Sequence, residues 1–162
     1  MSEKAKTGSA VSAATLAAMG EALDDEYKAR ATYRKVIATF GPVRPFVNIV
    51  EAEDRHVRAL LDLYAGFGVA PPLDDWPGRV TAPASLEEAC TAAVQGEIDN
   101  AAMYDRLLAA VDDPAVQNVL RALQRASQEN HLPAFRRCLA RDGGDGGGGR
   151  GRRFRGGRGR GV

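Results

Sequence analysis

The stretch "EAEDRHVRAL" (residues 51–60) decides the fold, because it places two polar side chains where a helix should be apolar. Around it, apolar residues recur at alternating steps of three and four: Phe46, Ile49, Leu60 and Leu63. Glu53 and His56 continue the same series. This spacing defines the inward face of an amphipathic helix, so we expect Glu53 and His56 to be buried.

Three other segments repeat apolar residues with the helical period, and no segment of comparable length alternates with the period of two that strands require. The four expected helices cover roughly residues 14–40, 45–65, 85–111 and 114–142. The third begins with a capping box formed by Ser85 and Glu88. Each of the other three inward stripes also contains polar residues: Glu26 in the first, Glu97 in the third, and Ser127 and His131 in the fourth. The sequence therefore predicts an all-α protein.

The lengths of the connections predict the topology. The first and last pairs of helices are joined by only a few residues, which favours two antiparallel hairpins. The middle connector, residues 67–84, contains four prolines. Its 18 residues can span roughly 59 Å, whereas a 24-residue helix is about 36 Å long. We therefore expect a four-helix bundle with one long crossover, as in ferritin-like proteins, and Trp76 to hold the crossover against the bundle.

The 162 residues fall into two parts of different composition. Residues 143–162 contain 11 glycines, six arginines and one aspartate, which leaves about −4 for the rest of a chain whose net charge is +1. We expect a flexible N-terminus (1–13), one bundle (14–142) and a disordered Gly/Arg-rich tail (143–162). No apolar run is long enough to span a membrane, so we expect a cytoplasmic protein.

The two halves of the bundle share a pattern that indicates an internal duplication. "EYKARATY" (26–33) and "EIDNAAMY" (97–104) each place a tyrosine seven residues after a glutamate. "EDRH" (53–56) and "QENH" (128–131) each place an acid or its amide three residues before a histidine, and these are the chain's two histidines. Each hairpin is therefore expected to supply half of one site.

Burying three carboxylates without partners would cost several kcal/mol each, so the pattern calls for a cation. Carboxylate oxygen and imidazole nitrogen suit iron or manganese. Cys90 and Cys138 form no CxxC pair, which excludes a zinc or iron site made of thiolates. No motif indicates a nucleotide cofactor.

At these residues the chain resembles the ferritin-like di-iron carboxylate proteins, most closely the rubrerythrin-like branch, over about residues 15–141. "EYKARATY" is similar to the E-x-x-A-R-x-x-Y of the first rubrerythrin helix. The resemblance implies that Glu26, Glu53, Glu97, His56 and His131 are metal ligands, with Glu53 bridging two ions. It also implies that Tyr33 and Tyr104 orient the ligand carboxylates.

Gln128 departs from the family pattern, because it stands where a second bridging glutamate is expected. An amide supplies no negative charge, so three carboxylates facing two divalent ions leave an excess of +1. Glu129 is two residues from His131 and lies about 200° around a regular helix, so only a π-bulge would turn it inward.

The resemblance implies a metal-dependent oxidoreductase, a peroxidase or ferroxidase in oxidative-stress defence or iron handling, that takes electrons from an external donor. Two alternatives stay open: a nucleic-acid-associated protein that binds RNA or DNA weakly through the arginines of residues 143–162, and a metal-free helical interaction module. A homodimer is the expected assembly.

The cysteines leave two interpretations open. Cys90 precedes Glu97 by seven residues and Cys138 follows His131 by seven, so an antiparallel hairpin places both at the same end. They are either two small buried apolar residues or a disulfide or redox dithiol that links the two helices.

Overall fold

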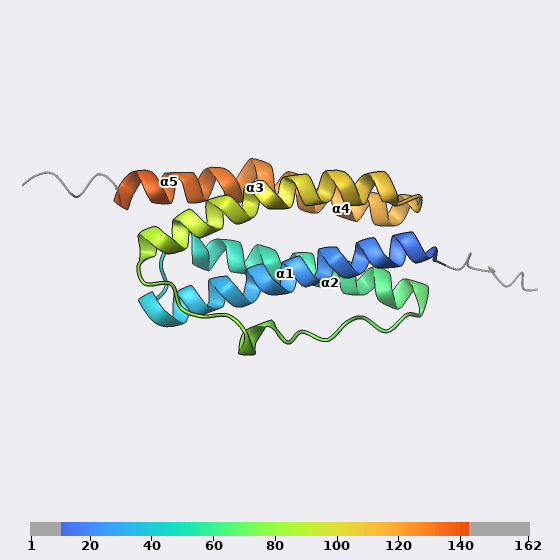
Figure 1. Ribbon diagram of the computed structural model, residues 1–162, viewed down its shortest axis with the longest axis horizontal. Helices are drawn as coiled ribbons and strands as arrows, with labels where there is room; N and C mark the ends of the chain where they lie inside the picture. The colour runs from blue at the N-terminus through green and yellow to red at the C-terminus, as the bar shows by residue number, and fades with distance from the viewer. Residues whose placement is uncertain (1–10, 143–162) are drawn as a thin grey trace, which may run out of the picture.

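The computed structural model describes residues 11–142, and the helices within this range form a four-helix bundle (Figure 1). The first hairpin consists of α1 (Ala13–Phe40) and α2 (Phe46–Phe67). The second pairs α3 (Leu86–Ala110) with a continuous helix made of α4 (Pro114–Ala126), the short π-helix η2 (Ser127–His131) and α5 (Leu132–Asp142). The expected all-α fold and helix order are confirmed, within about two residues at the helix ends.

Local side-chain chemistry explains where these helices begin and end. The Ser85 hydroxyl accepts a hydrogen bond from the Glu88 amide, and the Glu88 carboxylate accepts one from the Ala84 amide, which starts α3. The Asp113 carboxylate accepts hydrogen bonds from the Ala115 and Val116 amides and so caps α4. Gly68 ends α2 with φ of 67°, a left-handed conformation that glycine adopts without steric cost. The sequence therefore encodes each of these ends locally.

The long crossover runs along the outside of α1 and returns the chain to the end of the bundle where α2 begins (Figure 1). α2 and α3 therefore point the same way, as the connector length predicted. A single turn of 3-10 helix, η1 (Trp76–Gly78), interrupts the crossover and packs against α1. Among the described helices, none is both long and apolar enough to cross a membrane.

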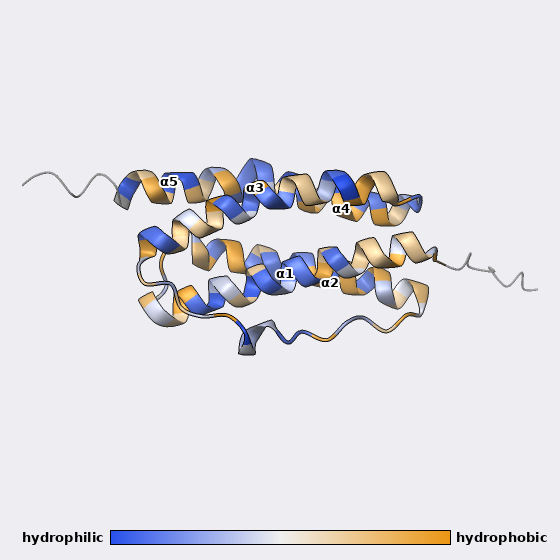
Figure 2. Cartoon of the chain, in the orientation of Figure 1, coloured by the Kyte–Doolittle hydropathy of each residue, from blue (hydrophilic) through white to orange (hydrophobic). Residues whose placement is uncertain are grey.

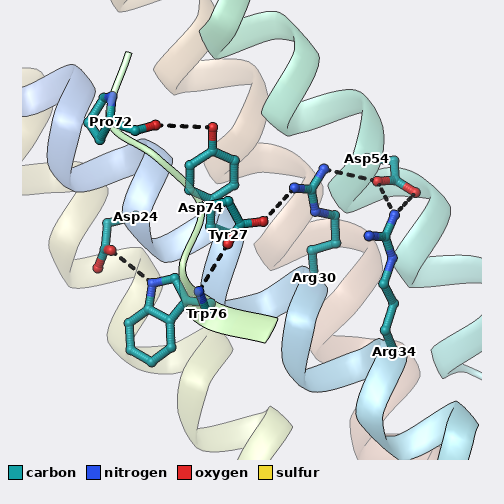
Figure 3. Close-up of polar contacts among 8 residues, drawn as sticks. All are labelled: Asp24, Tyr27, Arg30, Arg34, Asp54, Pro72, Asp74 and Trp76. Atoms are coloured by element: carbon teal, nitrogen blue, oxygen red, sulfur yellow. Dashed lines mark hydrogen bonds and ion pairs between the residues drawn. The ribbon is translucent and has the colours of Figure 1, made fainter. Parts of the chain in front are cut away.

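Polar contacts fix the crossover to α1 (Figure 3). Trp76 donates from its indole nitrogen to Asp24, at 2.8 Å, which confirms its expected role. Arg30 donates to Asp74 of the crossover at 2.8 Å and to Asp54 of α2 at 3.2 Å. Arg30 thus joins three separate segments of the chain.

The core is divided into two apolar clusters, one toward each end of the bundle. The first contains buried residues such as Met19, Leu60, Tyr104 and Leu120, and the second contains Tyr33, Phe46, Cys90 and Phe135. In every helix of the bundle, the polar residues of the inward stripe separate these clusters, and the middle of α1 is visibly hydrophilic (Figure 2). The predicted flexible N-terminus, up to residue 10, and the predicted disordered tail lie outside the described residues.

Because Arg30 joins three segments, we expect it to contribute more to stability than Arg34, which binds the same aspartate. Arg30 and Arg34 both bond Asp54, but their side chains are 16% and 53% exposed. We expect Arg30→Ala to lower the free energy of unfolding by about 2 kcal/mol, because it leaves two shielded aspartates without this partner. Arg34→Ala should cost about 0.5 kcal/mol. Urea denaturation measures both, and equal losses would contradict the assignment.

Candidate metal centre

Three carboxylates meet at the middle of the bundle, each brought there by a different helix. Glu26 of α1, Glu53 of α2 and Glu97 of α3 are 3%, 2% and 5% exposed. Within the described part of the chain, no lysine or arginine forms an ion pair with any of them. Their charged partners are the two histidines, and we therefore consider the five residues together as the carboxylate–histidine cluster.

Glu53 lies at the centre of this cluster and contacts both histidines. One of its oxygens is 2.8 Å from His56 Nδ1, and the other is 3.3 Å from His131 Nδ1. His56 Nδ1 is also 3.2 Å from Glu26, and His131 Nδ1 is 3.6 Å from Glu97. The cluster consequently contains two overlapping groups of potential ligands, Glu26–Glu53–His56 and Glu53–Glu97–His131, each with its donor atoms within 4.8 Å of one another.

The two tyrosines hold the terminal carboxylates from opposite helices. Tyr104 of α3 donates to Glu26 of α1 at 2.7 Å, and Tyr33 of α1 donates to Glu97 of α3 at 3.0 Å. Burial and the adjacent carboxylate raise the pKa of both tyrosines well above the ordinary value, so both hydroxyls keep their protons. The Glu-x6-Tyr motif of each half therefore orients the carboxylate of the other half.

Gln128 does not take part, which corrects the expectation that it faces the site at the position of a second bridging glutamate. Its side chain is exposed, as is that of Glu129. The residue that points inward is Ser127, which is buried and donates from its hydroxyl to Glu97 Oε2 at 2.5 Å. Serine thus occupies the place where the resemblance leads one to expect a second bridging carboxylate.

The π-helix η2 is the physical reason for this exchange. The Leu132 amide bonds the Ser127 carbonyl, five residues back, so the turn contains one residue more than an α-helical turn. In a regular helix the residues three and four before His131 both lie near its face. The wider π-turn keeps Ser127, four before, on that face and rotates Gln128, three before, outward. The π-bulge that Glu129 would need thus exists, but it turns Ser127 inward and leaves Glu129 outside. Such turns are frequent at functional sites.

A cavity of about 520 Å³ leads from the surface between α1 and α3 to the cluster. Small side chains line much of it, including Ala29, Ala93 and Gly96. On its wall, Asp25 accepts a hydrogen bond from the Asn100 amide nitrogen at 2.6 Å, while the Asn100 side-chain oxygen is buried with no partner. Burial raises the pKa of Asp25 to about 6. The cavity therefore gives small molecules a polar path to the ligand groups.

Burial and the close contacts between charged groups shift the pKa values of the cluster. Burial, with the charge of Glu53 adding to it, raises the pKa of Glu26 to about 8. Burial would also raise the pKa of Glu53, but its hydrogen bonds with His131 and His56 outweigh burial and lower it to about 2. Burial lowers the pKa of each histidine, but the carboxylate contacts outweigh it and raise the values to about 10 for His56 and about 9 for His131. Protons on the imidazoles thus neutralise the carboxylates when no metal ion does.

Comparison with known proteins adds a structural neighbour. No protein-family model matches the chain, and no curated protein matches it. Among solved structures, the fold is similar to that of a hypothetical protein from Methanococcus jannaschii DSM 2661, with a TM-score of 0.74 and 22% sequence identity. The match covers 88% of this chain and 87% of that chain. At this identity the likeness shows the all-helical fold alone.

These pKa values predict how the stability of the metal-free protein depends on pH. In the unfolded chain the histidines release their protons near pH 6.5 and Glu26 releases its proton near pH 4.5. The folded state keeps these protons to higher pH. Their contribution is full at low pH and is lost as the pH rises through the folded values of about 8 to 10. The melting temperature of metal-free protein should therefore fall by several degrees between pH 6 and pH 10. A flat or rising profile would contradict this protonation scheme.

Proposed function

We propose that the carboxylate–histidine cluster is a dinuclear site for iron or manganese and that the protein is an oxidoreductase acting on peroxide or O2. The observation that carries the proposal is the position of Glu53, whose two oxygens face two separate ligand groups. A carboxylate shared in this way is suited to bridge two ions. Each ion position then has two carboxylates and one imidazole, a donor set that suits iron and manganese.

The arrangement of ligands follows the general pattern of di-iron bundles in three of the four helices. Such bundles use one glutamate from each of two helices and a glutamate–histidine pair from each of the other two. Here α1 and α3 provide the single glutamates, and α2 provides Glu53 and His56. The fourth helix provides His131 with Ser127 in place of a glutamate. This supports the ferritin-like, rubrerythrin-like kinship proposed from the sequence.

The chain's own residues have defined roles in this proposal. Tyr33, Tyr104 and Ser127 hold terminal carboxylates in fixed orientations, which preorganises the site. The apolar clusters on either side exclude water, and the cavity admits the substrate. Bound iron or manganese would supply the redox electrons for reducing peroxide or O2.

Metal content after reconstitution tests the proposal. We expect about two Fe(II) or Mn(II) ions per wild-type chain. Glu53→Gln should bind less than one, because this carboxylate serves both positions, whereas Glu26→Gln should lose one ion and keep the other. The matched control is Glu51→Gln, which removes the same charge from an exposed position of the same helix and should keep both ions. Wild-type protein without bound metal after reconstitution would exclude the proposed function.

The π-helix predicts that Ser127 and Gln128, although adjacent, respond differently to the same substitution. Ser127→Glu adds a fourth carboxylate beside the cavity, which balances two divalent ions, and should tighten binding of the weaker ion by about tenfold or more. Gln128→Glu, its control, adds the same charge on the exposed face and should leave the affinity unchanged. Metal titration followed by calorimetry measures both. Tighter binding in Gln128→Glu alone would show that the helix is regular at this point.

A further inference from the structure

Cys90 of α3 and Cys138 of α5 are joined by a disulfide in the apolar cluster next to the proposed site. Of the two interpretations left open by the sequence, the bonded pair is therefore the one observed. Their side chains are buried, with Cys90 fully covered and Cys138 5% exposed. Cys90 precedes Glu97 by seven residues and Cys138 follows His131 by seven, which is two helical turns, or about 10 Å along each axis. The disulfide thus joins the two helices that carry Glu97 and His131, two of the three members of one ligand group.

Packing alone does not require cysteine at these positions. In the first half of the duplicated pattern, the residues seven before Glu26 and seven after His56 are Met19 and Leu63. Met19 is buried in the other apolar cluster, and Leu63 packs against it. Ordinary apolar side chains therefore fill the equivalent places. The cysteine pair adds to the second half a reversible chemistry that the first half lacks.

Buried side chains lie between the cysteines and the ligands. Phe135 and Tyr33 lie in the same buried cluster as the disulfide, and their ring centres are 5.2 Å apart. The hydroxyl of Tyr33 in turn bonds Glu97. The two cysteines and the two aromatic rings thus belong to one buried cluster, and Tyr33 joins that cluster to a ligand carboxylate.

We propose that Cys90 and Cys138 form a two-electron store for the cluster, cycling between dithiol and disulfide; this inference rests on the proposed function. For hydrogen peroxide the step balances: the O–O bond breaks, the S–S bond forms, two electrons pass from sulfur to oxygen, and the two thiol protons end on two water molecules. A thiol or dithiol reductant from outside then restores the pair by exchange: it attacks at Cys138, the less covered of the two, Cys90 leaves as the thiol, and a second thiol releases Cys138. Reduction of one peroxide requires two electrons, which is what one cysteine pair releases.

Thiol counting on the full chain tests this directly. The protein is reduced completely with a phosphine under anaerobic conditions, freed of reductant, loaded with Fe(II) and mixed with excess hydrogen peroxide for a few seconds. Remaining thiols are counted by alkylation and mass spectrometry, and peroxide consumption is measured in parallel. We expect wild-type chains to lose both thiols and to consume one equivalent more peroxide per chain than Cys90→Ser/Cys138→Ser.

Two controls separate the store from direct oxidation of cysteine. Metal-free wild type and Fe(II)-treated Glu53→Gln should keep both thiols over the same time. Single variants Cys90→Ala and Cys138→Ala serve if the double variant folds poorly, and each should lose the additional equivalent. Thiols lost equally fast without the metal site would overturn the inference.

The remaining outcomes distinguish this inference from the proposed function. If wild type and the double variant bind metal and consume equal amounts of peroxide while the thiols persist, the store is rejected and the oxidoreductase stands. If neither protein binds metal or consumes peroxide, the proposed function itself is wrong and the inference falls with it.

Discussion

The contact of Glu53 with two histidines is the interaction on which the rest of the structure depends. A carboxylate that is 2% exposed loses its hydration, at a cost of several kcal/mol, and the two imidazoles recover that cost only if both are held within hydrogen-bond reach. His56 is on the same helix as Glu53, but His131 comes from the far end of the chain. The first hairpin therefore cannot satisfy its own central carboxylate, and association of the two hairpins is coupled to completion of the cluster.

The tyrosines extend this coupling along the bundle. Each terminal glutamate accepts a hydrogen bond from a tyrosine of the opposite hairpin, and each tyrosine ring belongs to a different apolar cluster. Because each ring is packed in an apolar cluster, its hydroxyl holds the glutamate carboxylate at a defined position along the bundle axis, between the two clusters. The apolar core thus determines the geometry of the polar centre, and the polar centre fixes the register of the helices.

Most of the fold could be predicted from the sequence because its determinants are local. The periodicity of the apolar stripes predicts four helices, and Ser85 with Glu88 predicts the start of one of them. Residues 67–84 are long enough to cross the bundle, which predicts two hairpins joined by a long crossover. The buried positions of Glu26, Glu53, Glu97 and His131 follow from the same stripes. Joining of Cys90 to Cys138 could not be derived, since a seven-residue offset from each ligand places both at one end of a hairpin without fixing their separation.

The π-helix shows where sequence reasoning was wrong and why. Comparison of "EDRH" with "QENH" assumes that both helices are regular, and under that assumption Gln128 faces the site. The apolar stripe of the fourth helix contained the contrary signal, because its inward series runs through Ser127 to His131. The extra residue in this turn changes the backbone hydrogen bonds of the helix, but it has no characteristic sequence motif, so it could not be predicted locally. The stripe, which reflects burial, was therefore more reliable than the motif.

These departures all fall in the second hairpin, which gives the bundle an asymmetry that the duplicated pattern does not predict. The first hairpin keeps regular helices, a glutamate–histidine pair and apolar residues at the positions that correspond to the cysteines. The second has a π-turn, a serine beside its terminal glutamate and a disulfide. Serine is smaller than glutamate and lines the cavity together with Glu97 and His131. The second hairpin thus exchanges one ligand charge for space beside Glu97 and His131. Glu26, Glu53 and His56 line the same cavity, so the two ligand groups share its access but differ in the side chain that stands beside them.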